Sequence, residues 1–165
     1  MSDSSYNEEA GKAIELLSKG AFLTTAHGGK TNTMTIAWGG IGFMWGKPIF
    51  TVMVRPSRFT FQLIEQSGEF TVSLPGEAMQ PAINFCGANS GRDTDKIDAA
   101  GLKLTPGKKV DTPIIAGGSR HYECKVLYKQ VMTPATASSE VQTKWYPGGD
   151  YHTMYFGEIV ATYTG

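Results

Sequence analysis

Residues 32–45 read NTMTIAWGGIGFMW and combine a strand-like pattern with a run of glycines. Alternation along a strand would give two faces, with Asn32, Met34, Ile36 and Trp38 on one and Thr33, Thr35 and Ala37 on the other. Glycine weakens a strand unless a backbone or ligand must come close, so Gly39 and Gly40 indicate such an approach beside Trp38. A flat heteroaromatic ligand that bonds to exposed backbone would suit this site. The alternative is a buried core strand with a bulge at the glycines.

Strand-like segments recur on both sides of this stretch. They are rich in β-branched and aromatic residues, are bounded by turn residues, and cover 21–26, 32–38, 48–54, 69–75, 120–132 and 151–163. Helical periodicity appears over 8–19 and after Pro56, and residues 76–101 mix a helix, a polar loop and a helical turn. No repeated βαβ unit is present. The pattern therefore predicts a mainly β domain, a mostly antiparallel barrel or sandwich with peripheral helices.

The composition restricts the class of protein. The chain has 165 residues, which suits one domain, and its fifteen basic and fifteen acidic residues give a formal net charge of zero. This balance argues against a nucleic-acid-binding protein. Cys86 and Cys124 lie far apart, so they predict buried free thiols rather than a disulfide framework or a zinc site. The polar N-terminus does not resemble a secretory signal and no apolar run reaches membrane-span length, so we expect a cytoplasmic protein without a membrane partner.

The sequence VRPSRFT, residues 54–60, predicts an anion site. A strand ends here and a helix is expected to begin near Ser57, where unpaired backbone N–H groups attract negative charge. Arg55 and Arg58 can hold phosphate oxygens in bidentate fashion, and Ser57 and Thr60 add hydroxyl donors. The alternative is that Ser57 only caps the helix and that both arginines are solvated.

Two further polar motifs follow. In NSGRDTDK, residues 89–96, Arg92 and Lys96 could add positive charge to the anion site; the alternative is a plain solvated loop. The aspartates of this loop lack the later bidentate glutamate of a calcium site, so no metal is expected. His152, within residues 148–159, could donate a proton, contact a cofactor or belong to the core. No Walker A motif, nucleophile elbow or GxGxxG loop is present, so a Rossmann loop cannot hold a nucleotide here.

Taken together, the motifs NTMTIAWGG, VRPSRFTFQLIEQSGEFTVSLP, CGANSGRDTDK and HTMYFGEI occur in the order and spacing of the flavin reductase-like FMN-binding split-barrel family. The resemblance runs from about Ala21 to Val160 and is greatest to the flavoredoxin branch. It implies a single flavin reductase-like domain over 1–165 with an N-terminal helical arm over 1–20. The implied fold is a six-stranded antiparallel Greek-key split barrel with a few peripheral helices. The family is usually homodimeric and binds FMN non-covalently near the dimer interface.

The resemblance also implies site residues, grouped by role. Asn32, Met34, Thr35, Ala37 and Trp38 would border the flavin, Arg55, Ser57, Arg58 and Thr60 would hold or flank its phosphate, Ser90, Arg92 and Lys96 would close the pocket, and His152, the expected catalytic residue, would lie near the flavin or the nicotinamide. The chain departs from the family at GFMW, residues 42–45, where many members have small polar residues. There Met44 and Trp45 would either narrow the access to the pocket or pack against a partner subunit.

The implied activity is that of a flavin reductase-type oxidoreductase, in which electrons pass from NAD(P)H through FMN to an acceptor. The cofactor supplies the difficult chemistry, so no protein nucleophile is required. Two alternatives stay open. In one, the chain is a flavoredoxin-like electron-transfer protein whose FMN is reduced by a redox protein partner. In the other, it is a non-catalytic module that binds flavin.

Overall fold

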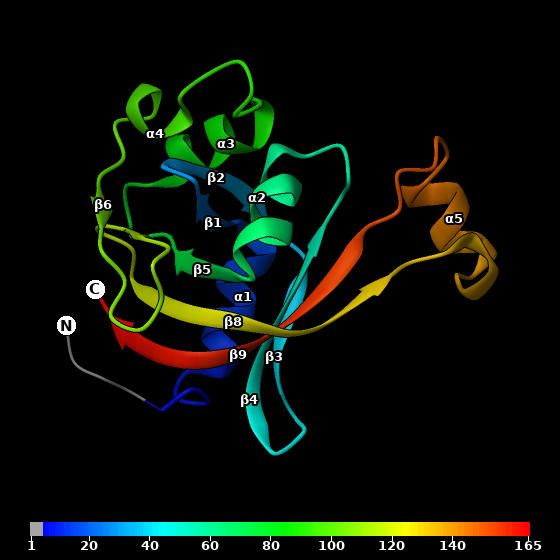
Figure 1. Ribbon diagram of the computed structural model, residues 1–165, viewed down its shortest axis with the longest axis horizontal. Coiled ribbons are helices and arrows are strands. Elements are labelled where there is room, and N and C mark those ends of the chain that lie inside the picture. Colours follow the sequence, from blue (N-terminus) through cyan, green and yellow to red (C-terminus); the bar gives the residue numbers. More distant parts are fainter. Residues whose placement is uncertain (1–4) are drawn as a thin grey trace.

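The computed structural model describes residues 5–165, so the first four residues of the predicted N-terminal arm lie outside the described part of the chain. Its centre is a seven-stranded antiparallel sheet with the order β2-β1-β5-β8-β9-β4-β3 (Figure 1). The strands of this sheet are β1 (Ala21–His27), β2 (Lys30–Ile36), β3 (Gly39–Met44), β4 (Lys47–Val54), β5 (Glu69–Leu74), β8 (Arg120–Val131) and β9 (Thr153–Thr164). Two short strands, β6 (Leu104–Thr105) and β7 (Ile114–Ile115), pair separately.

The predicted mainly β, antiparallel class is confirmed, but the main sheet has seven strands instead of six. The additional strand is β3, whose sequence GGIGFM begins with two glycines of low strand propensity. It pairs with β4 without a break, from Gly39 opposite Val52 to Met44 opposite Lys47. Residues 32–45 thus contain the end of β2, a short link through Ala37 and Trp38, and a second strand.

Gly39 is the position in this stretch that requires glycine. Its φ is +147°, which side-chain-bearing residues rarely adopt, and a Cβ there would lie 2.3 Å from the carbonyl oxygen of Thr51. Gly40 has open space where a Cβ would be. The close approach at Gly39 is therefore made by the backbone of β4.

The turn predicted at HGGK, residues 27–30, joins β1 to β2. Gly28 and Gly29 have φ values of +58° and +77°, as a two-residue hairpin turn with positive φ at both positions requires. This turn sets the register of the hairpin, so that Asn32 lies opposite Thr25 and Ile36 lies opposite Ala21.

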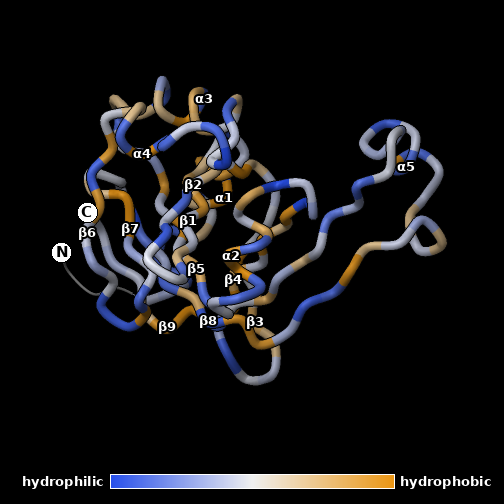
Figure 2. The backbone as a smooth tube through the Cα atoms, turned by 45° about the horizontal axis from the view of Figure 1, so that its top comes forward, coloured by the Kyte–Doolittle hydropathy of each residue, from blue (hydrophilic) through white to orange (hydrophobic). Residues whose placement is uncertain are grey.

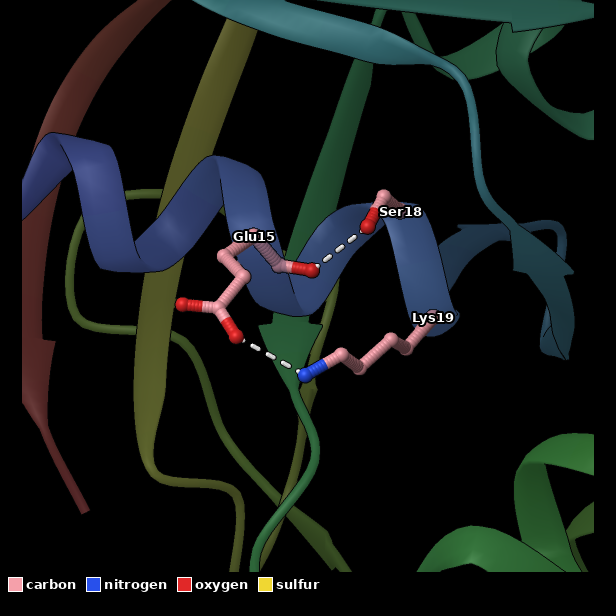
Figure 3. Close-up of polar contacts among 3 residues, drawn as sticks. All are labelled: Glu15, Ser18 and Lys19. Atoms are coloured by element: carbon pink, nitrogen blue, oxygen red, sulfur yellow. Dashed lines mark hydrogen bonds and ion pairs between the residues drawn. The ribbon is translucent and has the colours of Figure 1, made fainter.

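Helix α1 (Ala10–Lys19) confirms the predicted N-terminal helix and buries Ala13 and Leu17. On its outer face Lys19 Nζ lies 2.8 Å from Glu15 Oε1, and Ser18 Oγ donates to the Glu15 carbonyl at 2.7 Å (Figure 3). An exposed pair at this spacing adds only about 0.3–0.5 kcal/mol, so burial of the inner face holds the helix to the sheet.

Both faces of β1 are buried, which fixes its central place. Leu23 packs into the main core with Val72 and Tyr122, whereas Phe22 packs into a second cluster with Ile83. Ile83 belongs to α3 (Gln80–Ala88), which lies over β2 and β1 with α2 (Phe59–Ser67) and α4 (Lys96–Ala99) nearby (Figure 1). The helix expected near Ser57 begins at Phe59 and ends at Ser67, with Gly68 as its C-terminal cap.

Strands β8 and β9 form a long ribbon that leaves the body of the molecule (Figure 1). Its outer end carries a 3₁₀ turn (Pro134–Thr136) and the helix α5 (Ser139–Trp145). Neither was expected, because residues 133–150 look like a loop in the sequence. Figure 2 shows that this end is mainly hydrophilic. We call residues 132–152 the arm.

Candidate functional site

A cavity of about 180 Å³ lies at the end of β2, and we call it the Trp38 cavity. It is bounded by β2 and the link that follows it, by the end of β4 with the turn after it, and by the residue before β9. The lining residues are Met34, Thr35, Ile36, Ala37, Trp38, Met53, Arg55, Arg58 and His152. The fold thus brings together predicted site residues from three separate motifs.

A second cavity of about 580 Å³, the Lys96 cavity, lies beside the first. Its walls come from the β1–β2 turn, the start of α2 and the loop before α4. The lining residues are Gly29, Lys30, Thr31, Asn32, Phe59, Gln62, Gly91, Arg92, Asp93, Thr94, Asp95 and Lys96. Residues that line the two cavities are close in sequence at two places. On β2, Asn32 lines the Lys96 cavity and Met34 lines the Trp38 cavity; at α2, Phe59 lines the former and Arg58 the latter.

Three predicted site residues, Ser57, Thr60 and Ser90, line neither of these cavities. Thr60 is fully buried and accepts a hydrogen bond from Asn32 Nδ2 at 2.8 Å. Ser90 Oγ accepts from the backbone N–H of Arg92 at 3.2 Å. These hydroxyls shape the walls by holding the residues that line them.

Ser57 is bonded to the arm. Asp150 Oδ1 accepts from the Ser57 N–H at 3.2 Å, and Asp150 Oδ2 accepts from the Ser57 hydroxyl at 2.5 Å. Arg55 also faces the arm, since its guanidinium donates to the carbonyls of Trp145 at 2.9 Å and Asp150 at 3.1 Å. The turn after β4 is therefore fastened to the arm by a carboxylate and a guanidinium.

Arg58 differs from the neighbouring arginines. Arg55 bonds to the arm, and Arg92 Nη1 donates to the Ser57 carbonyl at 2.7 Å. Within residues 5–165 no hydrogen bond or ion pair involves the Arg58 guanidinium, although this exposed side chain lines the Trp38 cavity. Its charge is therefore available to an anionic ligand in the Trp38 cavity.

The Lys96 ammonium adds charge from a buried position. The residue is only 4% exposed, and Nζ donates to the Cys86 carbonyl at 3.0 Å. Burial lowers the pKa of Lys96, and the nearby Arg58 charge lowers it further. The Cys86 thiol acts in the opposite direction, but burial is the largest cause of the shift.

His152 is the last residue of the arm and lines the Trp38 cavity. Burial lowers its pKa to about 4, and the Arg55 and Arg58 charges act in the same direction. The ring is therefore neutral at pH 7. Its Nδ1 lies 2.6 Å from the Tyr146 hydroxyl, and its ring centroid lies 5.4 Å from that of Trp38.

Three residues of the arm complete the surroundings of the cavity and were not predicted. Trp145 packs edge-on against Trp38 at 4.8 Å between centroids, Tyr146 contacts His152, and Asp150 holds Ser57. Each of them contacts a residue about 90 or more positions away in the sequence. Trp145 contacts Trp38, Tyr146 contacts Arg55, and Asp150 contacts Ser57. The only sequence feature that could have indicated these residues is the aromatic pair Trp145 and Tyr146 before the PGGD turn, residues 147–150.

The hairpin at Phe43, Met44 and Trp45 is not part of the cavity wall. Trp45 instead contacts Tyr128 and Phe156, with ring centroids 5.8 and 6.0 Å away. We call Trp45, Tyr128 and Phe156 the aromatic patch. The described residues therefore do not support the alternative in which Met44 and Trp45 narrow the access to the pocket.

Cys86 and Cys124 are both free and buried, as the sequence predicts. Residues 5–165 contain no group of three or more His, Cys, Asp or Glu that could hold a metal ion. No helix in the same residues has the length and hydropathy to cross a membrane.

Comparison with known proteins agrees with the resemblance seen in the sequence. The flavin reductase like domain family matches residues 16–165. A protein of Archaeoglobus fulgidus, described as uncharacterized, is 30% identical over 131 residues, which is 79% of this chain and 64% of that protein. The chain thus spans slightly less than two thirds of that relative's length.

Solved structures share the fold. Flavoredoxin of Desulfovibrio vulgaris (Miyazaki F) is similar with a TM-score of 0.71 and 25% identity, over 88% of this chain and 69% of that one. An FMN-binding domain of a flavin reductases-like enzyme from Shewanella baltica is similar with a TM-score of 0.72 and 22% identity, over 99% of this chain and 76% of that one. With a family match that covers nearly the whole chain, these similarities show that the protein belongs to the flavin reductase-like domain family and has its split-barrel fold.

Proposed function

We propose that this chain is an FMN-dependent oxidoreductase that takes electrons from NAD(P)H and passes them to an acceptor. The observation that carries the proposal is the unpaired guanidinium of Arg58, which lines the Trp38 cavity and whose charge also acts on Lys96 in the wall of the Lys96 cavity. A ligand with a flat ring and a phosphate needs these two kinds of site next to each other.

The residues present fit FMN. The backbone from Met34 to Trp38 lines one wall and offers N–H and C=O groups to a ring edge, while Arg58 offers paired donors to phosphate oxygens. In the lining of the adjoining cavity the cations of Lys30, Arg92 and Lys96 outnumber the carboxylates of Asp93 and Asp95 by one. Nothing in the chain requires a covalent attachment, so we expect non-covalent binding.

The chain's own residues would bind and orient the flavin and exclude water from it. Bound flavin supplies the capacity to accept a hydride and to release electrons. Trp38 and Trp145 form an apolar wall, and the neutral His152 offers a hydrogen-bonding nitrogen without adding charge. His152 would therefore contact the ligand through a hydrogen bond and would not give up its ring proton.

Absorbance gives the first test of this function. Purified protein should be yellow or should become so when FMN is added, and anaerobic mixing with NADH or NADPH should bleach the flavin band. A colourless protein that does not bind added FMN would contradict the proposal. Binding without reduction by either nucleotide would remove the reductase part only.

The similarity to flavoredoxin favours a second candidate, an electron-transfer protein whose FMN is reduced by a redox protein. Stopped-flow mixing separates the two candidates. Reduction by a protein donor, with no reaction from either nicotinamide nucleotide, would establish the carrier.

We also propose that the chain forms a homodimer through the aromatic patch. Trp45 is 59% exposed and Tyr128 is 46% exposed, although aromatic residues are usually buried or placed at interfaces. Trp45 also has a φ of +53°, an uncommon conformation for a large side chain. The hairpin accepts this conformation and leaves the indole on the surface.

A further inference from the structure

The contact between Tyr146 and His152 is the shortest polar contact at the Trp38 cavity that involves a titratable ring. The Tyr146 oxygen lies 2.6 Å from His152 Nδ1, and both residues are buried, at 5% and 9% exposure. One hydrogen must lie between the two atoms, and its position determines what the other ring nitrogen carries.

The available partners assign this hydrogen to the tyrosine. The Tyr146 hydroxyl has a single proton to donate. The hydroxyl proton then has two acceptors, Nδ1 at 2.6 Å or the Met132 sulfur at 3.6 Å, and a thioether is the weaker acceptor. The Tyr146 O–H therefore donates to Nδ1, which leaves the ring proton of neutral His152 on Nε2.

The second nitrogen of the ring is open to the cavity. No residue in 5–165 hydrogen-bonds to His152 Nε2, yet this atom is not among the buried polar atoms that lack a partner. Because His152 lines the Trp38 cavity, its accessible edge is the one that carries Nε2.

We propose that Tyr146 is a positioning residue that fixes His152 in the Nε2–H tautomer, so that a neutral N–H donor faces the Trp38 cavity. The cavity would then select ligands with a hydrogen-bond acceptor on a flat ring, such as a ring carbonyl or an unprotonated ring nitrogen. Only the identification of this ligand as flavin or nicotinamide rests on the proposed function.

Burial is the main reason that the His152 ring stays neutral, and the nearby charges modify this effect. Arg55 and Arg58 face it from the turn after β4, and Asp150, whose carboxylate acts in the opposite direction, faces it from the arm. The hydroxyl of Tyr146 adds a bond that only the unprotonated Nδ1 can accept. Removal of this hydroxyl should therefore raise the pKa of His152 towards its ordinary value.

Nitrogen NMR of flavin-free protein labelled at the imidazole nitrogens tests the proposal directly. The chain has three histidines, and His152→Gln identifies the signals of His152. We expect an unprotonated Nδ1 and a protonated Nε2 at pH 7. Tyr146→Phe should mix the two tautomers and raise the pKa. Tyr151→Phe is the matched control, because its ring stacks on Tyr146 at 4.4 Å but its hydroxyl does not reach His152.

Binding provides the second readout. Tyr146→Phe should weaken FMN or NAD(P)H binding about two- to tenfold, the effect of one hydrogen bond, and should add nothing in the His152→Gln background. A protonated Nδ1 in the unmodified protein would overturn the proposal even if Tyr146→Phe did not fold. Additive effects of the two substitutions would overturn it as well. The expected tautomer in a protein that binds no flavin would overturn the proposed function alone.

Discussion

Arg58 is the residue on which we expect the proposed FMN binding to depend most, because its guanidinium has no partner among the described residues. Arg58→Ala should weaken FMN binding about tenfold or more, since a charge-assisted hydrogen bond is lost and no other side chain replaces it. Titration of the flavin fluorescence measures the dissociation constant. Lys47→Ala is the control, because it removes one positive charge from a residue paired with Glu158, outside the cavity wall. Equal affinity of the Arg58→Ala and Lys47→Ala variants would contradict the phosphate assignment.

His152 predicts a pH dependence of stability. Its pKa is about 4 in the folded chain and 6.5 ordinarily, so between these values the unfolded chain binds a proton that the folded chain does not. The free energy of unfolding should therefore decrease as the pH falls from about 6.5 to about 4, by up to about 3 kcal/mol from this residue.

Urea unfolding of flavin-free protein at a series of pH values measures this effect. His152→Gln should flatten the dependence relative to the unmodified chain over the same interval. A residual slope is expected, because burial also lowers the pKa of His121 to about 4. Curves of identical slope would show that His152 is not buried in its neutral form.

At the scale of the elements, β3 depends on one backbone position. Gly39→Ala places a Cβ 2.3 Å from the Thr51 carbonyl oxygen at a φ of +147°, so we expect a loss of about 2 kcal/mol or more in the free energy of unfolding. Gly40→Ala is the matched control, because the Cβ would meet open space. It should cost less than about 1 kcal/mol in chemical denaturation. Similar losses for both variants would mean that strand propensity and not the close approach sets the requirement.

The arm depends on Asp150 for its attachment to the turn after β4. Asp150→Ala removes the acceptor of the Ser57 N–H and hydroxyl, and we expect the Ser57 amide to exchange with solvent about fivefold faster or more. Hydrogen-exchange mass spectrometry over residues 55–60 measures this. Asp150→Asn keeps an oxygen acceptor and tolerates the φ of +55°, so it should preserve most of the protection. Unchanged exchange in Asp150→Ala would show that the turn holds its shape without the arm.

For the whole molecule, the aromatic patch predicts an interface. Trp45→Asn removes the indole and suits the positive φ of the turn, so the fold should persist while the dimer dissociates. Sedimentation equilibrium should show a dimer for the unmodified chain and a shift of the dissociation constant by about tenfold or more for the variant. Trp145→Ala, at an exposed tryptophan outside the aromatic patch, should leave the association state unchanged. A monomeric unmodified chain would refute the interface.

The fold was predictable to the extent that its strands carry local patterns. The apolar runs of β1, β4 and β5 and the glycine turn before β2 indicated antiparallel strands. Strand β3 was not visible, because GGIGFM has low strand propensity and becomes a strand only through its pairing with β4. Helix α5 was missed for a related reason, since a short polar helix carries little periodicity.

The sequence by itself determined the mainly antiparallel class and the positions of most strands, and it supplied the residue types on which the proposed anion and flat-ring sites rest. These follow from local periodicity and from side-chain chemistry, which the order of residues encodes directly. Only the tertiary structure decided which arginine is free. Arg55, Arg58 and Arg92 look equivalent in the chain, but carbonyls from the arm and from Ser57 occupy two of them and leave Arg58 open. Partners that lie far apart in sequence set this difference, and no local pattern records them.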